Sequence, residues 1–491
     1  MRINFTKIVA TLGPSSDNLA TVEELIQAGL DVARLNFSHG SYLNFKEIAT
    51  NVRKAAKRHN RNVALLQDLQ GPKIRLGRLP KEGVPIKKST EIILSTAATK
   101  FTPTTSKKET PRLPVQYKNL HKDVKKGSRL FIDDGLIQVE VTRVQGREIH
   151  CKVKTSGRLF PNKGINAPDS TITAQPFTKK DHQDLKFGLK LDVEYVALSF
   201  VRNAQDIKNL RRTIEKYNKS LRKKHTPKII AKIERKEALD NLDEIIEEVD
   251  GIMIARGDLG VEIKPELVPI AQKSIIKACN RVGKPVITAT QVLNSMVENP
   301  RATRAEISDA ANAVYDGSDA IMLSNETAVG KYPYKAVQTL SKTISAVENK
   351  LKKSPQQLPQ PLQLPQPQTS ETPTDTSNAA SLSACELAIH TKAHKIITYT
   401  QDGFTPCQVT KHRVFITPIT ISPNERSLRE LSLIWGINHT IVKKFSKRDI
   451  SHGLDQAILK FLKLKKLVKK GEKIVIVYNA KDKGSVLSLT V

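Results

Sequence analysis

Short apolar runs alternate with amphipathic stretches from the start of the chain to about residue 75. The runs TKIVATLG, DVARLNF and NVALLQDL have the length and composition of buried strands. The stretches DNLATVEELIQAGL and SYLNFKEIATNVRKAAKRH have helical periodicity, and Asp17 or Asn18 is a suitable N-cap for the first of them. This βαβαβ order predicts a parallel sheet whose strands are joined by helical crossovers.

The pattern changes after Gly71 and Pro72. Residues 76–175 alternate apolar and polar positions, contain many turn residues and show no convincing helix, which predicts a small inserted β domain. Strand and helix patterns then alternate again through residues 176–352 and supply five more strand candidates. Three strands before the insertion and five after it make eight, the number of parallel strands that closes a (β/α)₈ TIM barrel.

A Pro/Gln-rich segment, KSPQQLPQPLQLPQPQTSETPTDTSN, interrupts the pattern once more. It has no apolar periodicity and is typical of an extended linker. Beyond it, runs such as KIITYT, VFITPIT and KIVIVYN predict a smaller C-terminal α/β domain. The predicted fold class is an α/β TIM barrel with an inserted small β-barrel domain and a C-terminal α/β domain. The predicted divisions are barrel 1–75, insertion 76–175, barrel 176–352, linker 353–378 and C-terminal domain 379–491.

Composition supports a globular protein with several cores. Hydrophobic residues make up 39% of the 491 residues, and no run of about eighteen apolar residues predicts a membrane span. The N-terminal stretch MRINFTKIVATLGPSS has no basic flank, apolar core and cleavage site, so we expect no secretory signal. The cysteines have no CxxC spacing, which disfavours disulfides and a zinc site and favours a cytoplasmic protein. They are Cys151, Cys279, Cys385 and Cys407.

The formal net charge of +31 indicates anionic partners, which include nucleic acids and small anions. Aromatic residues make up only 5% of the chain, with a single tryptophan, so platforms for base stacking are scarce. Nucleic-acid binding is therefore disfavoured as the main function. A non-catalytic basic binding protein remains an alternative hypothesis.

Polar side chains of catalytic types stand at the ends of four successive predicted strands. Lys232 and Glu234 are two residues apart, so on an extended strand both point to the same side. Asp258, Thr290 and Ser324 follow the next three strands. A single strand-end charge that meets solvent would need no explanation. The whole set favours an active site, because barrel enzymes place their chemistry at the C-terminal ends of the strands.

The residue types at these strand ends suit metal-assisted chemistry on a phosphate. Two carboxylates with open positions suit Mg²⁺ or Mn²⁺, and a lysine beside them can neutralise an oxyanion. Arginines at the first strand ends have the planar geometry that binds phosphate oxygens. The polar residues of these first strand ends are Arg34, Asn36, Ser38, His39, Asp68, Lys73 and Arg75.

These residues lie in motifs that resemble the pyruvate kinase family. The motifs are TLGPSS, RLNFSHG, LQDLQGPKIR, KGIN, AKIE, ARGDLG, TATQ, NPRATRAEISDAANAV and IMLSNETA. They occur in the order of that family, and the likeness covers nearly the whole chain except the Pro/Gln-rich segment. The resemblance implies phosphoryl transfer from phosphoenolpyruvate to ADP, which gives pyruvate and ATP in the final step of glycolysis. It also implies Mg²⁺ or Mn²⁺ as cofactor and a homotetramer.

The resemblance also implies a role for each matching residue. Lys232 would stabilise the transferring group and the enolate oxygen, while Glu234 and Asp258 would hold the metal. The loop of Ala255, Arg256, Gly257 and Asp258 would cradle the substrate carboxylate. Thr290 would contact the substrate, and Ser324 would belong to a proton relay. The residues expected to face phosphate or nucleotide are Arg34, Asn36, His39, Arg75 and, from the inserted domain, Lys163.

A nucleotide-contacting Lys163 would make the inserted domain a lid that closes over the phosphates and excludes water. Its hinges are expected near residues 71–73 and 175–176. A plain loop lysine at this position is the alternative.

One departure from the family concerns the monovalent cation. The residues that match its site are Asn36, Ser38, Asp68 and Leu69. Leu69 cannot act as a ligand through its side chain, and Lys73 could supply a tethered positive charge that repels K⁺. We therefore expect activity that is independent of K⁺.

The C-terminal domain is expected to be regulatory. Its loop YTQDGFTPCQ contains Thr400 and Thr405 but lacks the lysine-serine run of fructose-bisphosphate sites, so a sugar monophosphate or AMP is as suitable an effector. A barrel lyase or aldolase that acts on a 2-oxo acid is the alternative enzyme, and it leaves Arg34, Arg75 and Lys163 without a role.

Overall fold

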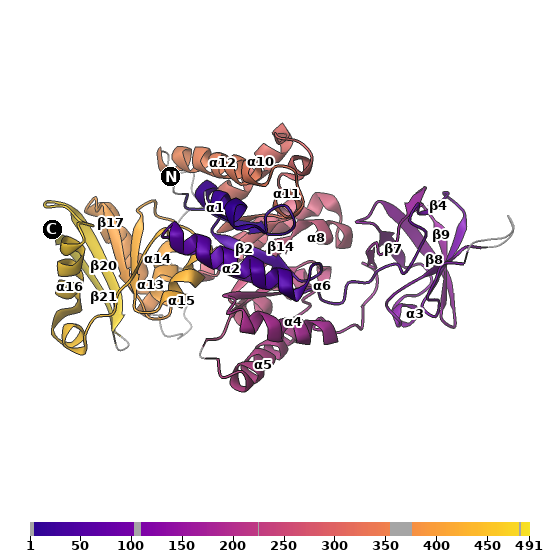
Figure 1. Cartoon of the computed structure of the whole chain (residues 1–491), viewed down its shortest axis with the longest axis horizontal. Coiled ribbons are helices and arrows are strands. Elements are labelled where there is room, and N and C mark those ends of the chain that lie inside the picture. Colours follow the sequence, from indigo (N-terminus) through magenta and orange to yellow (C-terminus); the bar gives the residue numbers. More distant parts are fainter. Residues whose placement is uncertain (1–3, 103–109, 224, 354–375, 481–482) are drawn as a thin grey trace, which may run out of the picture.

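The structure of the protein is a computed structural model, and it describes all residues except 1–3, 103–109, 224, 354–375 and 481–482. The Pro/Gln-rich segment predicted over residues 353–378 lies almost entirely outside the described residues. The described part forms a row of three bodies, with the barrel in the middle, the inserted domain at one end and the C-terminal domain at the other (Figure 1).

The central body is a closed barrel of eight parallel strands, as predicted. Going around the barrel, the strands follow the order β1-β16-β15-β14-β13-β12-β3-β2. Their bounds are β1 (Lys7–Thr11), β2 (Val32–Asn36), β3 (Ala64–Asp68), β12 (Tyr195–Leu198), β13 (Lys228–Ile233), β14 (Gly251–Ala255), β15 (Val286–Ala289) and β16 (Ala320–Leu323).

Helices surround the barrel and bury the outward faces of its strands. Because both strand faces are buried, the strands are short apolar runs rather than alternating ones. Side chains such as Val9, Leu66 and Met253 fill the barrel interior. The surrounding helices are α1 (Leu19–Ala28), α2 (Tyr42–Arg58), α4 (Lys179–Lys190), α5 (Ala204–Ser220), α6 (Lys236–Asp240), α7 (Leu242–Glu248), α8 (Arg256–Glu262), α9 (Val268–Val282), α10 (Arg304–Tyr315), α11 (Asn325–Ala328) and α12 (Pro333–Lys353).

Polar caps determine where several of these helices begin. Asn18, one of the two candidate caps, accepts a hydrogen bond from the Thr21 amide at the start of α1. Helix α10 begins with a capping box in which Thr303 and Glu306 bond each other's backbone amides. Such caps satisfy amides that have no partner within the helix.

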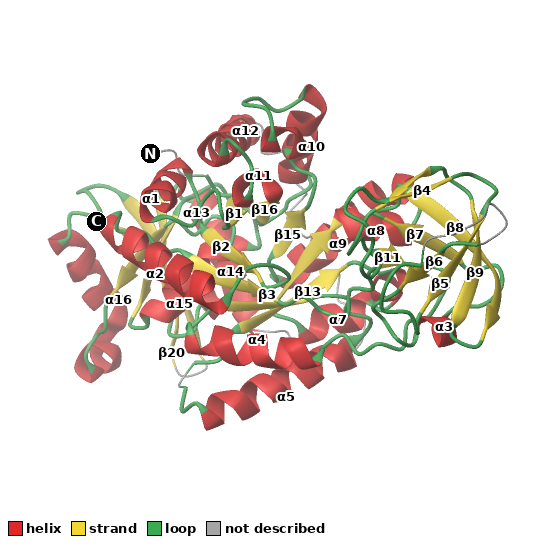
Figure 2. Cartoon of the chain, turned by 45° about the vertical axis from the view of Figure 1, so that its right-hand side comes forward, coloured by secondary structure: helices red, strands yellow, loops and turns green. Residues whose placement is uncertain are grey.

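The inserted domain is a separate β structure with its own apolar core. Its strands form a six-stranded sheet in the order β11-β7-β8-β9-β5-β6 and a pair of β10 with β4, which Figure 2 shows apart from the barrel. One helical turn, α3 (Leu120–Asp123), stands where no helix was expected, because four residues are too few to give a helical pattern. The strands are β4 (Val84–Ile86), β5 (Glu91–Ser95), β6 (Arg112–Pro114), β7 (Arg129–Ile132), β8 (Ile137–Gln145), β9 (Glu148–Val153), β10 (Gly157–Leu159) and β11 (Ile165–Asn166).

The C-terminal domain is an α/β unit built on a sheet of order β19-β18-β17-β20-β21. Strand β21 is antiparallel to β20, and the other pairs are parallel. The run VFITPIT predicted a strand from Val414, but β18 begins only at Pro418. The elements are α13 (Thr376–His390), β17 (Lys395–Tyr399), α14 (Phe404–Thr410), β18 (Pro418–Ser422), α15 (Glu425–Glu430), β19 (His439–Val442), α16 (Lys447–Leu464), β20 (Lys473–Ala480) and β21 (Lys483–Thr490).

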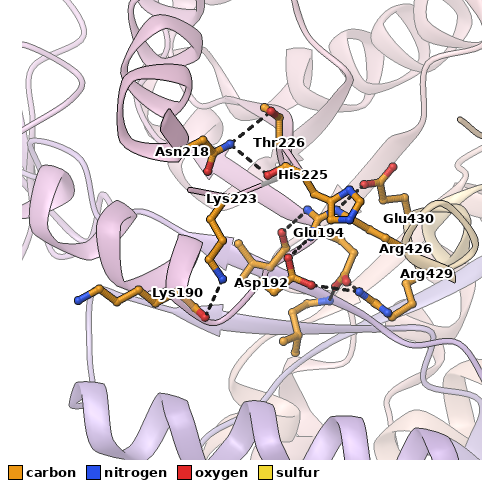
Figure 3. A network of polar contacts seen from close by, with 12 residues as sticks. Lys190, Asp192, Glu194, Asn218, Lys223, His225, Thr226, Arg426, Arg429 and Glu430 are labelled. Carbon is orange, nitrogen blue, oxygen red and sulfur yellow. Dashed lines mark hydrogen bonds and ion pairs between the residues drawn. The ribbon is translucent and has the colours of Figure 1, made fainter. Parts of the chain in front are cut away.

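This domain packs against the N-terminal ends of the barrel strands. Glu194, directly before β12, is fully buried and accepts a hydrogen bond from Arg429 Nε at 2.6 Å. Arg426 and Arg429 of helix α15 both pair with Asp192, and Figure 3 shows this network between the two bodies. The opposite, C-terminal ends of the strands are left facing the inserted domain. Among the described residues, no helix combines the length and apolar character needed to cross a membrane.

Candidate active site

Lys232 lies near the C-terminal end of β13, and its ammonium group is the centre of the candidate site. Its Nζ atom donates to Ser199 Oγ at 2.7 Å and pairs with Glu234 Oε1 at 2.9 Å and Asp68 Oδ1 at 3.3 Å. Burial alone would lower the pKa of Lys232, but the carboxylates of Asp68, Glu234 and Asp258 outweigh it and raise the pKa above its usual range. The ammonium group therefore stays charged and can neutralise an anion.

Arg34 and Asp68 extend this cluster across β2 and β3. Arg34 donates to Asp68 Oδ2 from Nε at 2.8 Å and to Thr11 Oγ1 from Nη1 at 2.8 Å. Burial raises the pKa of Asp68, but Lys232 and Arg34 outweigh it and hold the pKa below its usual range. Asp68 is therefore a permanent negative charge that orients both cations.

Two carboxylates, Glu234 and Asp258, approach the site from neighbouring strand ends. Glu234 Oε2 accepts a hydrogen bond from the Phe200 amide at 2.7 Å, and Asp258 Oδ1 lies 3.2 Å from Lys73 Nζ. Burial raises the pKa of Glu234, and repulsion by Asp258 adds to the rise against the attraction of Lys232. Both carboxylates thus belong to the surroundings of Lys232, whose pKa they raise.

The donor set fits a hard divalent cation. Carboxylate oxygens suit Mg²⁺ or Mn²⁺, which commonly bind through one or two protein carboxylates and complete their coordination with substrate and water. No group of three or more His, Cys, Asp or Glu residues arranged to hold a metal occurs in the described ranges. Two carboxylates would leave the other coordination positions of such a cation to substrate oxygens and water.

Residues Ala255–Asp258 were predicted as a loop, and this prediction is wrong. Ala255 ends β14, and helix α8 begins directly at Arg256, so Gly257 and Asp258 lie in its first turn. The Gly257 amide donates to Thr290 Oγ1 at 2.7 Å. Because the first amides of a helix have no partner within it, they remain suited to bind an anion or a hydroxyl.

Thr290 is held in an unusual backbone conformation. Its φ of +67° is rare for a β-branched residue, and such strain persists only where the surroundings impose it. Arg256 helps to impose this backbone conformation. Its Nη2 donates to the Thr290 carbonyl at 2.9 Å, while its Nη1 pairs with Asp309 at 2.8 Å. Thr290 and the start of α8 thus form one hydrogen-bonded unit.

Ser324 follows β16 and stands beside α11. Its amide donates to Glu326 Oε2 at 2.7 Å, and the other oxygen of Glu326 accepts from the Leu293 amide at 3.0 Å. Glu326 therefore fixes the backbone of Ser324 and of the segment after β15. In the part of the chain that the structure describes, the partners of Lys232 Nζ are Ser199, Glu234 and Asp68, and Ser324 is not among them.

The residues predicted on the nucleotide side are divided between two bodies. Asn36 Oδ1 accepts from the Ser38 amide at 3.2 Å. Arg75 donates to the Asn162 carbonyl of the inserted domain at 2.9 Å. Lys163 pairs with Asp133 at 2.8 Å within the inserted domain and does not extend to the barrel cluster.

The pKa of His39 indicates the electrostatic character of the predicted nucleotide side of the site. Burial lowers its pKa, and neighbouring cations lower it further. These cations, in decreasing order of effect, are Arg75, Lys73, Arg34 and Lys180. The surroundings of His39 are therefore electropositive and suited to phosphate groups.

At the predicted monovalent-cation site, the oxygens of Asp68 are already engaged by Arg34 and Lys232. Leu69 is fully buried in the apolar core around the barrel, and only its backbone is polar. Lys73 pairs with Asp258 rather than with Asp68. The tethered charge thus lies beside the predicted metal ligand, not on the predicted cation site.

Sequence reasoning missed several residues that orient the site. Ser199 bonds Lys232, Thr11 bonds Arg34, and Glu326 bonds the backbone of Ser324. Ser199 directly follows β12, so the strand-end rule that found Lys232 and Asp258 would have found it too. The apolar run VALSFV hid the strand end, because two apolar residues follow the serine.

Comparisons with known proteins agree over both parts of the chain. The family profile "Pyruvate kinase, barrel domain" matches residues 3–337, and "Pyruvate kinase, alpha/beta domain" matches residues 378–486. Pyruvate kinases of Staphylococcus aureus strains MRSA252 and USA300 are each 40% identical over 444 residues, which is 90% of this chain and 72% of theirs. The crystal structure of a pyruvate kinase from Cryptosporidium parvum has a TM-score of 0.85 and 34% identity, over 99% of this chain and 96% of that one. The chain belongs to the pyruvate kinase family.

Proposed function

We propose that the enzyme transfers the phosphoryl group of phosphoenolpyruvate to ADP, giving pyruvate and ATP in the last step of glycolysis. The observation that carries the proposal is the charge cluster in which Lys232 Nζ lies 2.9 Å from Glu234 and 3.3 Å from Asp68. In-line phosphoryl transfer depends on positioning and charge neutralisation more than on covalent help. A permanently charged lysine beside two acidic groups at a barrel mouth provides both.

Each residue of the cluster has a role in this reaction. Lys232 neutralises the transferring phosphoryl group and the enolate oxygen. Arg34, oriented by Asp68 and Thr11, binds the phosphate before transfer. The amides at the start of α8 bind the substrate carboxylate.

The remaining strand-end residues complete the substrate site and the nucleotide side. Thr290 contacts the face of the enolate that receives a proton, and Ser324 belongs to the proton relay. Asn36, His39 and Arg75 bind the nucleotide from the barrel side.

Glu234 and Asp258 would hold Mg²⁺ or Mn²⁺. When bound, the ion supplies positive charge to the carboxylate and phosphate oxygens of the substrate. The raised pKa of Glu234, to which Asp258 contributes, supports this role, because a cation between the two carboxylates relieves their repulsion.

We further propose that the enzyme does not require K⁺. Lys73 Nζ already places a positive charge 3.2 Å from Asp258, and the buried side chain of Leu69 offers no oxygen ligand. A K⁺ ion near this ammonium group would meet repulsion rather than a binding site.

The inserted domain is proposed to act as a lid. Asn166 Nδ2 donates to Glu262 Oε1 of helix α8 at 3.1 Å, so lid and barrel already touch beside the helix that carries Asp258. Closure would bring Lys163 from its partner Asp133 to the nucleotide phosphates and exclude water from the reaction.

A phosphorylated effector, a sugar phosphate or AMP, is proposed to bind the C-terminal domain at the loop from Thr400 to Thr405 and to regulate the enzyme. In this loop Thr400 Oγ1 accepts from the Gly403 amide at 2.9 Å, and Asp402 accepts from the Phe404 amide at 3.0 Å. An anion must displace these bonds, which favours a weakly bound monophosphate. Thermal-shift measurements with AMP and sugar phosphates test this, and no shift with any of them contradicts it.

We also propose a cytoplasmic homotetramer. Ile270 and Leu267, at the start of α9, are 64% and 44% exposed, and apolar groups of this size on a helix surface are suited to bind another copy of the chain.

A coupled assay of ATP formation from phosphoenolpyruvate and ADP, with Mg²⁺ and an organic counter-ion in place of K⁺, tests the function. Wild type should turn over, and Lys232→Met should lose at least about 10³-fold in kcat. Lys208→Met, which removes a lysine that pairs with Glu248 on the outside of the barrel, is the matched control. Cleavage or condensation of a 2-oxo acid without ATP formation would instead support a lyase or aldolase.

A further inference from the structure

The turn after β12, formed by Ser199 and Phe200, contacts both ionised groups at the centre of the site. Ser199 Oγ accepts from Lys232 Nζ at 2.7 Å, and the Phe200 amide donates to Glu234 Oε2 at 2.7 Å. We propose that Ser199 is a positioning residue for phosphoryl transfer, which holds the Lys232 ammonium group in the place where it neutralises the substrate. This inference rests on the proposed function of Lys232.

The hydrogen-bond pattern leaves Ser199 one orientation. Its hydroxyl donates to the Leu69 carbonyl at 2.8 Å, so its oxygen lone pairs are directed at Lys232. A hydroxyl has one proton, and in Ser199 this proton is donated to the Leu69 carbonyl, so the oxygen can only accept from Lys232. Because Ser199 is only 2% exposed, both of its hydrogen bonds are shielded from solvent.

Ser199 differs from the other partners of Lys232 in being neutral. The ammonium group has three N–H donors, and its other acceptors are the carboxylates of Glu234 and Asp68. The electrostatic attraction of the carboxylates has little directional preference, so on its own it would leave the long lysine side chain free to rotate. A fixed neutral acceptor defines its position without adding negative charge against an anionic substrate.

The backbone of this turn is itself constrained. Phe200 has a φ of +56°, which is uncommon for a residue other than glycine, and the Arg235 guanidinium stacks over its ring at 5.5 Å. Gly71, in the predicted lid hinge, approaches so closely that a Cβ atom there would lie 3.0 Å from both Ser199 Cβ and Phe200 Cδ2. Backbone strain of this kind persists only where surrounding contacts impose it and often accompanies functional sites.

Two substitutions test the role of the Ser199 hydroxyl. Ser199→Ala removes the oxygen, and Ser199→Cys keeps the shape of the side chain but offers only a weak acceptor. Loss of a hydrogen bond to a charged group that acts in the transition state should lower kcat. We expect kcat to fall roughly 10- to 100-fold in both variants and KM for phosphoenolpyruvate to stay within about twofold of the wild-type value. Ser318→Ala is the matched control, because Ser318 is also buried and hydrogen-bonded, to Thr288 of β15.

The control separates positioning from general destabilisation. If Ser199→Cys keeps the wild-type melting temperature and loses kcat while Ser318→Ala keeps kcat, the proposal is supported. If both Ser199 variants keep kcat, or if Ser318→Ala loses as much, it is overturned.

Crystal structures of Ser199→Ala and Ser199→Cys provide a readout that does not depend on turnover. A Lys232 Nζ atom displaced toward the carboxylates supports the proposal, and an Nζ atom in its wild-type place overturns it. A wild-type enzyme without turnover would contradict the proposed function and leave this structural comparison to decide the role of Ser199.

Discussion

Lys73 is a single side chain whose charge bears on the ion requirement of the whole enzyme. Its Nζ lies 3.2 Å from Asp258, and its side chain is about a quarter exposed. We expect wild-type turnover to change less than about twofold on adding K⁺ to a buffer with an organic counter-ion, because the Lys73 ammonium group would repel K⁺ and the Leu69 side chain offers it no oxygen ligand. We expect Lys73→Glu to lose about tenfold in that buffer and to regain part of it with K⁺.

The control for this prediction is Lys208→Glu, which makes the same charge change on the outside of the barrel, where Lys208 pairs with Glu248. Steady-state rates of the wild type and both variants, measured with and without K⁺, test whether Lys73 makes the enzyme independent of K⁺. A wild type that K⁺ activates strongly would show the prediction to be wrong.

His412, which follows α14, should make stability depend on pH. Burial, together with a smaller contribution from the charge of Lys411, lowers its pKa to about 4. In the unfolded chain it takes up a proton near pH 6.5, whereas in the folded chain it stays neutral to about pH 4. Its contribution is therefore fully present above pH 6.5 and is lost as the pH falls toward 4, by roughly 2 kcal/mol after allowance for solvent screening.

Melting temperatures of wild type and His412→Gln, measured between pH 7.5 and 4.5, check this expectation. The wild type should lose more stability than the variant as the pH falls, since glutamine cannot take up the proton. His390→Gln, at an exposed position at the end of α13, should follow the wild type. Parallel curves for wild type and His412→Gln would contradict the prediction.

At the residue scale, the sequence predicts the ionised groups but not their partners. The sequence was enough to identify Lys232, Glu234 and Asp258, because each is a charged residue at or just after the end of an apolar run. The pairing of Lys163 with Asp133 could not, because it depends on how a turn of the inserted domain folds back. The roles assigned to these residues stay predictions until turnover is measured.

Strand β12 and helix α15 show how elements join the bodies of the molecule. Directly before β12, Glu194 accepts from Arg53 and Arg429. Arg429 also pairs with Asp192, as Figure 3 shows. Directly after β12, Ser199 bonds Lys232. One four-residue strand therefore connects the C-terminal domain to the catalytic cluster.

Removing Arg429 should weaken this junction. Arg429→Met leaves the buried Glu194 with a single cation, and we expect a loss of about 3 kcal/mol in unfolding free energy. The single tryptophan, Trp435, is buried beside Phe5 from the barrel, so its fluorescence in a urea titration follows the junction directly.

The matched control for the junction is Arg58→Met. Arg58 pairs with Glu23 on the surface, with half of its side chain exposed, and such a pair contributes less than about 1 kcal/mol. Equal shifts for the two variants would show that the buried network does not stabilise the junction.

At the element scale, the eight barrel strands were predictable because each is a compact apolar run bounded by turn residues. Helix α8 was not, since its sequence RGDLGVE contains two glycines, which disfavour a helix. Tertiary contacts override this preference, because the Gly257 amide bonds Thr290 and Leu259 is fully buried in the core. Local propensity alone therefore indicates a loop where packing forms a helix.

The whole molecule places its three bodies in a row, with the candidate active site between the barrel and the inserted domain and the C-terminal domain at the far end (Figure 1). This arrangement leaves the flank of the barrel free for contact with other copies of the chain. The order of the patterns along the sequence predicts the three bodies, but not their arrangement in a row. The sequence cannot predict the surface that another copy would cover, because the exposure of each side chain depends on how the helices pack.

The proposed tetramer can be tested on the exposed apolar face of α9. A net charge of +31 on each chain opposes association, so a stable assembly needs apolar contacts to offset the repulsion. Ile270, 64% exposed, is the most exposed apolar side chain of that helix. We expect the wild type to have the mass of a tetramer in light scattering and Ile270→Lys to shift to dimers or monomers, with a larger shift at low salt.

Leu43→Lys, at an 82% exposed leucine of α2, is the control and should keep the wild-type mass. A monomeric wild type, or an Ile270→Lys variant of unchanged mass, would show that this face is not a contact between chains.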